Sequence, residues 1–158
     1  RSEQFGPRRE SIAIASDHAG FALKEALRRA LVSMVERVDD LGTDSESPVD
    51  YPDFAEAVGR RVASGQSDRG ILICGTGIGM TIAANKIPGI RAATVWDETT
   101  ARLCRSHNDA NVLALGAREL PLELALTLAR VFLETPFSGG RHQQRVDKVT
   151  VLDRRAGG

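Results

Sequence analysis

Residues 71–80 read Ile-Leu-Ile-Cys-Gly-Thr-Gly-Ile-Gly-Met, and this stretch decides the fold class of the chain. The apolar run predicts a buried strand, the alternating glycines a tight turn, and the residues that follow a helix start. Backbone N–H groups of such a turn approach an anion closely, and the helix start adds a positive dipole end. This field favours the ionised form of Cys74. The stretch indicates either a reactive centre or an ordinary turn beside a buried cysteine.

Length and composition indicate one domain. The chain has 158 residues, of which 42% are hydrophobic and 27% are charged, and this is enough apolar material for a single compact core. Residues 1–10 are polar and lack periodicity, so we expect a flexible N-terminal extension there and one domain over residues 11–158.

The charge balance excludes several classes of partner. With 21 basic and 21 acidic residues the formal net charge is zero, which predicts neither nucleic-acid nor membrane-surface binding. No apolar run approaches the roughly 20 residues of a membrane span, and no signal-like stretch opens the chain. We therefore expect a cytoplasmic protein that holds any anionic ligand locally.

The cysteines and histidines predict no disulfide scaffold and no metal site. Only Cys74 and Cys104 occur, which fits a reducing compartment. The three histidines, His18, His107 and His142, lie far apart and share no ligand spacing with a cysteine. Neither a metal nor another cofactor is expected.

Strand and helix patterns alternate along the chain. We expect strands at residues 11–16, 35–41, 71–74, 91–95 and 112–115, separated by helical patterns such as 21–31 and 52–64. Continuous apolar strands indicate burial on both faces, which predicts a five-stranded parallel sheet in a three-layer α/β/α sandwich. A last helix over residues 138–155 has only a sparse apolar stripe, at Val146, Val149 and Leu152, so we expect it to reach a partner subunit.

Ligands of such sheets bind at the carboxyl ends of the strands, and in a 2-1-3-4-5 order the first and third strands meet there. These ends carry Asp17, His18 and Cys74, so a carboxylate, an imidazole and a thiol should share one crevice. Alternatively, Asp17 only caps the next helix and His18 lies on the surface.

Two further polar groups are candidates for the same site. Residues 106–111 should lie at or beside the ligand-binding end, where His107 would act as acid or base and Asn108 would orient a hydroxyl, unless both are merely exposed. Arg141 and Arg145 lie four residues apart on one helix face and, with Arg118, could grip a phosphate, although alone they are ordinary surface charge. His142 beside them is a bystander in this interpretation.

Several motifs together resemble one known family, ribose-5-phosphate isomerase of the B type. The resemblance covers residues 12–149 and rests on Asp17-His18-Ala19-Gly20, Cys74-Gly75-Thr76-Gly77-Ile78-Gly79, Ala84-Asn85-Lys86, His107-Asn108-Asp109-Ala110-Asn111 and Gly139-Gly140-Arg141-His142-Gln143-Gln144-Arg145. It implies a Rossmann-like fold, a phosphosugar substrate and a homodimer or tetramer whose active sites are shared between subunits. The implied reaction interconverts D-ribose 5-phosphate and D-ribulose 5-phosphate in the non-oxidative pentose phosphate pathway.

The resemblance also implies residue roles. Cys74 would take the proton from the sugar carbon, Thr76 would move protons between substrate oxygens, and His107 would open the furanose ring. Substrate contacts would come from Asp17, His18, Gly75, Thr76, Gly77, Ile78, Gly79, Asn108, Arg118, Arg141 and Arg145, the three arginines holding the phosphate. Part of the family uses a glutamate a few residues after the cysteine position, but here that position is Met80, which cannot accept a proton.

Three alternatives remain open. The substrate could be a six-carbon sugar, allose or galactose 6-phosphate, since the depth of the crevice depends on loops such as residues 45–52. A non-catalytic phosphosugar or nucleotide binding module would need the arginines but not Cys74. Dinucleotide binding would use the glycines with Asp97 as the ribose-binding acid, although the glycine spacing is imperfect and the turn follows the wrong strand.

Overall fold

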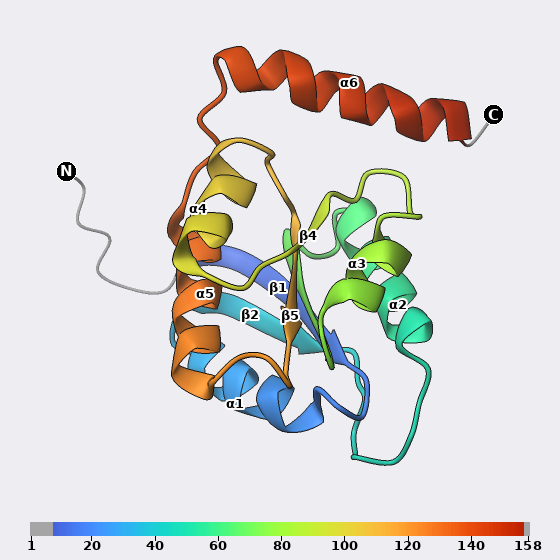
Figure 1. Cartoon of the computed structure of the whole chain (residues 1–158), viewed down its shortest axis with the longest axis vertical. Helices are drawn as coiled ribbons and strands as arrows, with labels where there is room; N and C mark the ends of the chain where they lie inside the picture. Colours follow the sequence, from blue (N-terminus) through green and yellow to red (C-terminus); the bar gives the residue numbers. More distant parts are fainter. Residues whose placement is uncertain (1–7, 157–158) are drawn as a thin grey trace.

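A computed structural model describes residues 8–156 as five strands and six helices that alternate along the chain (Figure 1). The strands are β1 (Arg8–Ser16), β2 (Val35–Asp40), β3 (Arg69–Cys74), β4 (Ala92–Thr94) and β5 (Val112–Gly116). The helices are α1 (Phe21–Leu31), α2 (Tyr51–Ala63), α3 (Ile78–Ala84), α4 (Glu98–Ser106), α5 (Leu122–Glu134) and α6 (Arg141–Ala156). All strand pairs are parallel, which confirms the predicted α/β class.

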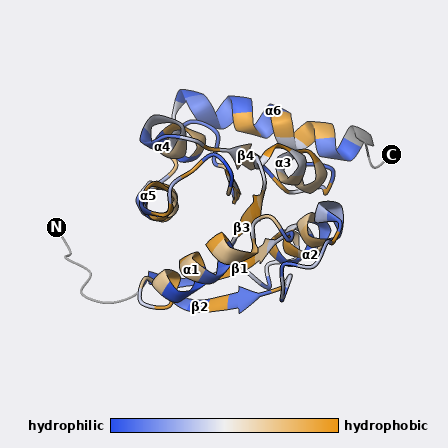
Figure 2. Ribbon diagram, turned by 60° about the horizontal axis from the view of Figure 1, so that its bottom comes forward, coloured by the Kyte–Doolittle hydropathy of each residue, from blue (hydrophilic) through white to orange (hydrophobic). Residues whose placement is uncertain are grey.

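Helices cover both faces of the sheet because its central strands are apolar on both sides. Along β1, Ile12 and Ile14 pack in the core that includes α1, α4 and α5, whereas Ala13 and Ala15 pack in the core that includes α2 and α3. Figure 2 shows hydrophobic residues concentrated on the strands in the middle of the molecule and mixed with hydrophilic ones along α6. The result is the predicted three-layer sandwich, with α6 outside its layers.

The expected strand order was wrong at one edge of the sheet. The order is β2-β1-β3-β5-β4, so the last two strands are exchanged relative to 2-1-3-4-5. All five residues of β5 are buried, whereas the three residues of β4 are only half-buried. Burying the longer apolar strand places β5 beside β3 and leaves β4 at the edge. The first and third strands are still neighbours.

The N-terminal boundary also differs from the expectation. β1 begins at Arg8 and not after residue 10, because Arg8 pairs with Val35 of β2 and Glu10 forms an ion pair with Arg69. The rest of the predicted extension, residues 1–7, lies outside the described residues. Within the described part of the chain, every helix is too short or too polar to cross a membrane.

Candidate active site

Cys74 lies at the carboxyl end of β3, and its side chain is buried beneath the glycine turn. The backbone N–H of Gly77 donates a hydrogen bond to the sulfur over 3.2 Å. Gly77 has a φ of 82°, which only glycine adopts without strain. A Cβ atom there would also lie 3.1 Å from the backbone of Leu115. Close packing against β5 therefore holds the turn in a conformation in which the Gly77 N–H faces the thiol.

Asp17 and His18 follow β1 at the same end of the sheet. The backbone N–H of Asp17 donates to the Ile73 carbonyl over 3.1 Å, which places Asp17 beside the end of β3. Its Oδ1 accepts a hydrogen bond from the Gly20 N–H at 3.0 Å, which closes the turn before α1, although the N-cap of this helix is Gly20 and no side chain caps it. His18 Nδ1 accepts a hydrogen bond from the Val49 N–H at 3.2 Å.

Arg118 and Thr76 complete this group. A Cβ atom on Gly75 would lie 2.9 Å from Nη1 of Arg118, so the guanidinium covers the backbone next to the thiol. Thr76 is exposed, and its Oγ1 accepts a hydrogen bond from the Ile78 N–H at 3.3 Å. We call Asp17, His18, Cys74, Thr76 and Arg118 the thiol cluster.

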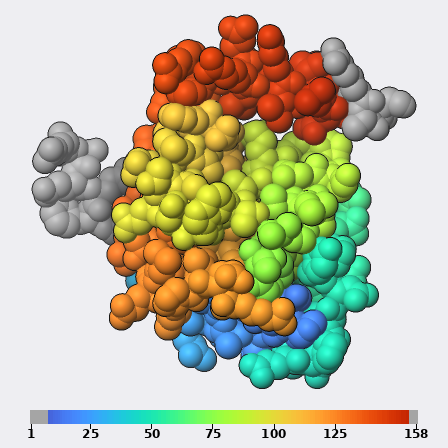
Figure 3. All heavy atoms as spheres, viewed as in Figure 1, coloured from blue at the N-terminus to red at the C-terminus, as the bar shows by residue number. Residues whose placement is uncertain are grey.

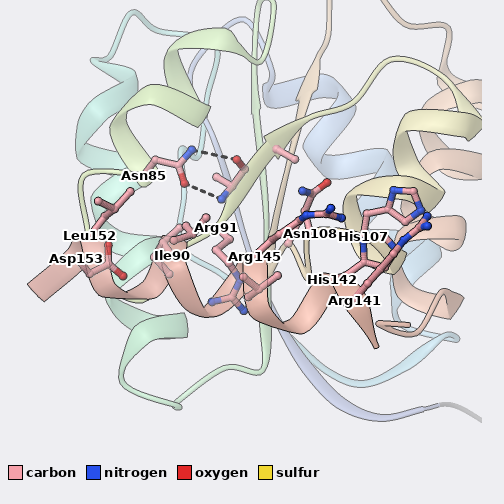
Figure 4. Close-up of a pocket in the computed structure, with 15 residues that line it drawn as sticks. Asn85, Ile90, Arg91, His107, Asn108, Arg141, His142, Arg145, Leu152 and Asp153 are labelled. Atoms are coloured by element: carbon pink, nitrogen blue, oxygen red, sulfur yellow. Dashed lines mark hydrogen bonds between the residues drawn. The ribbon is translucent and has the colours of Figure 1, made fainter. Parts of the chain in front are cut away.

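A second group lines a pocket of about 760 Å³ between α6 and the connection from α4 to β5. We call its polar members the histidine cluster: His107, Asn108, Arg141, His142 and Arg145. Figure 4 shows His107, Asn108, Arg141 and His142 at one end of the pocket, Arg145 near its middle, and Leu152 and Asp153 at the other end. α6, red in Figure 3, covers this end of the molecule.

His107 and His142 are stacked, with ring centroids 4.1 Å apart and ring planes 17° from parallel. The pKa of His142 is lowered, first by desolvation and then by the charges of His107, Arg141 and Arg145. His142 is therefore in direct contact with the candidate acid or base, a contact that its interpretation as a bystander did not include.

The two clusters lie at opposite ends of the sheet, which corrects two expectations. Residues 106–111 enter β5, and a connection that enters a parallel strand lies at its amino end, away from Cys74. β5 has five residues, so its two ends are roughly 15 Å apart at about 3.3 Å per residue. Arg118 accordingly does not share one anion grip with Arg141 and Arg145 within this chain.

The dinucleotide alternative does not fit the structure. The Asp97 carboxylate caps α4, accepting a hydrogen bond from the Thr100 N–H at 2.8 Å, and these hydrogen bonds lower its pKa. Asp97 also follows the edge strand β4, which β5 separates from the glycine turn after β3. A ribose-binding acid would have to be free and beside that turn.

Other contacts at the thiol cluster had no signal in the sequence. Val49 contributes a backbone N–H, which any residue but proline has. Thr81 and Thr94 contact each other across α3 and β4 through a pairing of distant segments. Tyr51 lies directly on Gly79, where a Cβ atom would be 2.6 Å from its ring. Tyr51 is the first residue of α2, and its position directly after the loop that bounds the crevice was its only signal in the sequence.

Fold and site together define a class of protein. A parallel sheet that presents a thiol, a carboxylate and an imidazole at its strand ends, with separate arginine groups, is suited to a small anionic ligand. Among the described residues, no three His, Cys, Asp or Glu side chains gather as metal ligands would.

Comparison with known proteins makes the class specific: the chain belongs to the Ribose/Galactose Isomerase family, whose model matches residues 12–149. It is 47% identical to ribose-5-phosphate isomerase B of Escherichia coli over 146 residues, which cover 92% of this chain and 98% of the relative.

Solved structures agree. Ribose-5-phosphate isomerase B of Clostridium thermocellum matches with a TM-score of 0.90 and 48% identity, covering 92% of this chain and 98% of that one. The enzyme of Mycoplasma genitalium, solved with bound ribulose-5-phosphate, matches with a TM-score of 0.88 and 43% identity, covering 91% and 96%. The family resemblance and the Rossmann-like fold are confirmed.

Proposed function

We propose that this protein is an aldose-ketose isomerase that interconverts D-ribose 5-phosphate and D-ribulose 5-phosphate in the non-oxidative pentose phosphate pathway. The observation that carries the proposal is the buried Cys74 thiol with the Gly77 N–H directed at it, among the glycine turn's other backbone donors. Ribulose-5-phosphate bound to the similar Mycoplasma genitalium enzyme supports the substrate class.

The reaction needs a base, a set of donors and a proton relay. As a thiolate, Cys74 takes the proton from C2 of the open-chain aldose, and the C–H electron pair forms the C1–C2 double bond of an enediolate. The negative charge moves to O1, where the backbone N–H groups of residues 75–79 that are not bound to Cys74 or Thr76 would stabilise it without reorganisation. Thr76 passes a proton from O2 to O1, and Cys74 returns its proton to C1, which gives the ketose.

Because Met80 stands where part of the family has a glutamate, the Cys74 thiol is the base in this chain. Its side chain is fully buried in the core between the sheet and α2 and α3, and a thioether cannot accept a proton from carbon. Cys104 is the alternative thiol, but burial among apolar groups raises its pKa to about 11, so it stays protonated.

The remaining roles require the histidine cluster of a second copy. We propose a homodimer, or a tetramer built from such dimers, in which the partner's histidine cluster faces the thiol cluster. There His107 would open the sugar ring, Asn108 would contact the sugar, and Arg141 and Arg145 would hold the phosphate with Arg118. The distance of roughly 15 Å between the two ends of β5 supports this arrangement, because one pentose phosphate cannot span both clusters of one chain.

Exposed apolar residues support the same assembly. Ile78 and Ile82 lie one helical turn apart on α3, directly after the glycine turn, and are 55% and 57% exposed. Val149 and Leu152 of α6 line the pocket that holds the histidine cluster and are 51% and 55% exposed. Burial of both pairs against a second copy would bring the two clusters together and cover these apolar surfaces. In this proposal α6 is the element that reaches the partner.

The family description also includes galactose isomerases, so a six-carbon phosphosugar is the second candidate substrate. We favour the pentose because Tyr51 lies on Gly79 and limits the crevice beside the glycine turn. A panel of ribose, allose and galactose phosphates, assayed for isomerisation without added metal or nicotinamide, tests this choice.

Exchange of the base tests the mechanism. Cys74→Ala should abolish turnover of ribose 5-phosphate while phosphosugar binding, measured by calorimetry, persists, because the contacts to the phosphate remain. Cys104→Ala is the matched control and should leave kcat unchanged, since this thiol only packs in the core and donates to the Ala101 carbonyl at 3.2 Å. Unchanged turnover in Cys74→Ala would reject the proposed base, and a phosphosugar binder without any turnover in the wild type would support the non-catalytic module.

A further inference from the structure

Two threonines outside the substrate-contacting set form a chain of hydrogen bonds into the glycine turn. The Oγ1 atoms of Thr81, in α3, and Thr94, at the end of β4, are 2.6 Å apart. Thr81 Oγ1 donates to the Gly77 carbonyl at 2.9 Å, whereas Thr94 Oγ1 is 3.5 Å from the same oxygen. Each hydroxyl has one proton, and the shorter contacts are both made if Thr94 donates to Thr81 and Thr81 donates to Gly77.

The series of hydrogen bonds continues through the peptide group that joins Gly77 to Ile78. The carbonyl of this peptide accepts the Thr81 hydroxyl and the Thr81 N–H, the latter at 3.1 Å. Hydrogen bonds to a carbonyl polarise the amide and strengthen its N–H as a donor. That N–H belongs to Ile78, and it donates to Oγ1 of Thr76 at 3.3 Å.

The last hydrogen bond of this series, from the Ile78 N–H, determines in which direction the Thr76 hydroxyl can pass a proton. Its oxygen has two lone pairs, and the Ile78 N–H occupies one of them. The other lone pair remains to accept a proton from one substrate oxygen, and the O–H proton remains to be given to the next. A hydroxyl arranged in this way takes up one proton and releases another in the same step, which is what transfer between O2 and O1 requires.

We infer that Thr81 and Thr94 are positioning residues for the isomerisation. Through the Gly77–Ile78 peptide they fix the orientation of the Thr76 hydroxyl, so that its oxygen can accept one proton while its O–H group donates another. This inference rests on the proposed isomerase function and extends it to two residues that do not touch the substrate.

Isosteric substitutions test the inference by removing hydroxyl groups without changing side-chain volume much. Thr81→Val should lower kcat roughly fivefold with KM for ribose 5-phosphate nearly unchanged, the size expected for one lost hydrogen bond. Thr94→Val, one link further from Thr76, should lower kcat less. Thr81→Ser keeps the hydroxyl and should restore most of the wild-type kcat.

Thr127→Val is the matched control, because Thr127 makes the same bond to the carbonyl four residues back, to Glu123 at 3.0 Å in α5, far from the glycine turn. It should leave kcat unchanged. Unfolding in urea shows that each variant folds. A kcat of Thr81→Val and Thr94→Val equal to that of the wild type, or a kcat of Thr81→Ser as low as that of Thr81→Val, overturns the inference. An inactive wild type would instead overturn the proposed function.

Discussion

His18 is held by a hydrogen bond that decides which of its ring nitrogens carries the proton. Its Nδ1 accepts the Val49 N–H at 3.2 Å, so Nδ1 has no proton and Nε2 carries the N–H of the neutral ring. In the proposed mechanism, Nε2 would then donate to a sugar oxygen. Val49, in the loop before α2, thus orients His18, which follows β1.

The role of the Val49 N–H can be tested by replacing Val49 with proline. Val49→Pro has no N–H at this position and should raise KM for ribose 5-phosphate roughly fivefold, since His18 loses its orientation while Cys74 is untouched. Steady-state kinetics measure the effect. Val49→Ala keeps the N–H and should behave as the wild type, so equal KM values in the two variants would exclude this role for His18.

At the residue scale, the sequence predicted side chains better than it predicted backbone contacts. Asp17 and Cys74 could be placed together because Asp17 follows one buried strand and Cys74 ends another, and the two strands are neighbours. The Val49 N–H could not be predicted, because a backbone donor has no residue-specific signal. The stack of His107 on His142 depends on how α6 packs, which local pattern does not determine.

At the element scale, α1 is fixed to the sheet by a buried cation. The side chain of Lys24 is fully buried, and its ammonium lies 2.8 Å from Asp40 at the end of β2 and 3.0 Å from Glu25. The bidentate bond of Lys24 to Asp40 satisfies the buried charge. Arg28, one helical turn after Glu25, extends the network.

This network predicts how stability depends on pH. The pKa of Glu25 is lowered from 4.5 to about 2, mainly by the hydrogen bond from Arg28 and then by that from Lys24. Because the folded-state pKa lies below the unfolded one, the stabilisation is complete above pH 4.5 and is lost as the pH falls toward 2. Glu25→Gln should therefore lose less unfolding free energy over this range than the wild type, as urea titrations at each pH would measure.

The control for this prediction is Glu56→Gln, which removes a carboxylate from an exposed pair with Arg60 on α2. Surface pairs of this kind contribute little, so its pH dependence should follow that of the wild type. If Glu25→Gln loses as much free energy as Glu56→Gln on acidification, the network around Lys24 does not stabilise α1.

The elements themselves were largely predictable, but their arrangement was only partly so. Apolar runs identified β1, β3 and β5, because both faces of the sheet are covered there and each run is continuous, whereas β2 is mostly charged and β4 is only half-buried at the edge. The exchange of β4 and β5 was not visible, since strand order depends on which strand buries more surface across the sheet. That exchange does not affect the pairing of β1 with β3, so the position of Cys74 beside Asp17 was predicted correctly.

At the scale of the whole molecule, the proposed active site is complete only in an assembly. Each chain carries the thiol cluster at one end of its sheet and the histidine cluster at the other, where α6 meets the connection from α4 to β5. A homodimer in which these ends face each other would hold two equal sites, each built from both chains. Defects in different clusters would then affect the two sites of a mixed dimer unequally.

Mixing of inactive variants tests this arrangement directly. Cys74→Ala and Arg141→Ala should each be nearly inactive alone, the first without a base and the second with a weakened phosphate grip. After joint unfolding and refolding, about half of the dimers are mixed, and each mixed dimer has one site with both defects and one intact site, so activity should recover to about a quarter of the wild type. A mixture of Cys74→Ala with Arg118→Ala, both in the thiol cluster, should recover nothing, because every mixed dimer then has one defect in each site. Equal activities of the two mixtures would mean that the clusters do not meet across the interface, and the shared site would have to be abandoned.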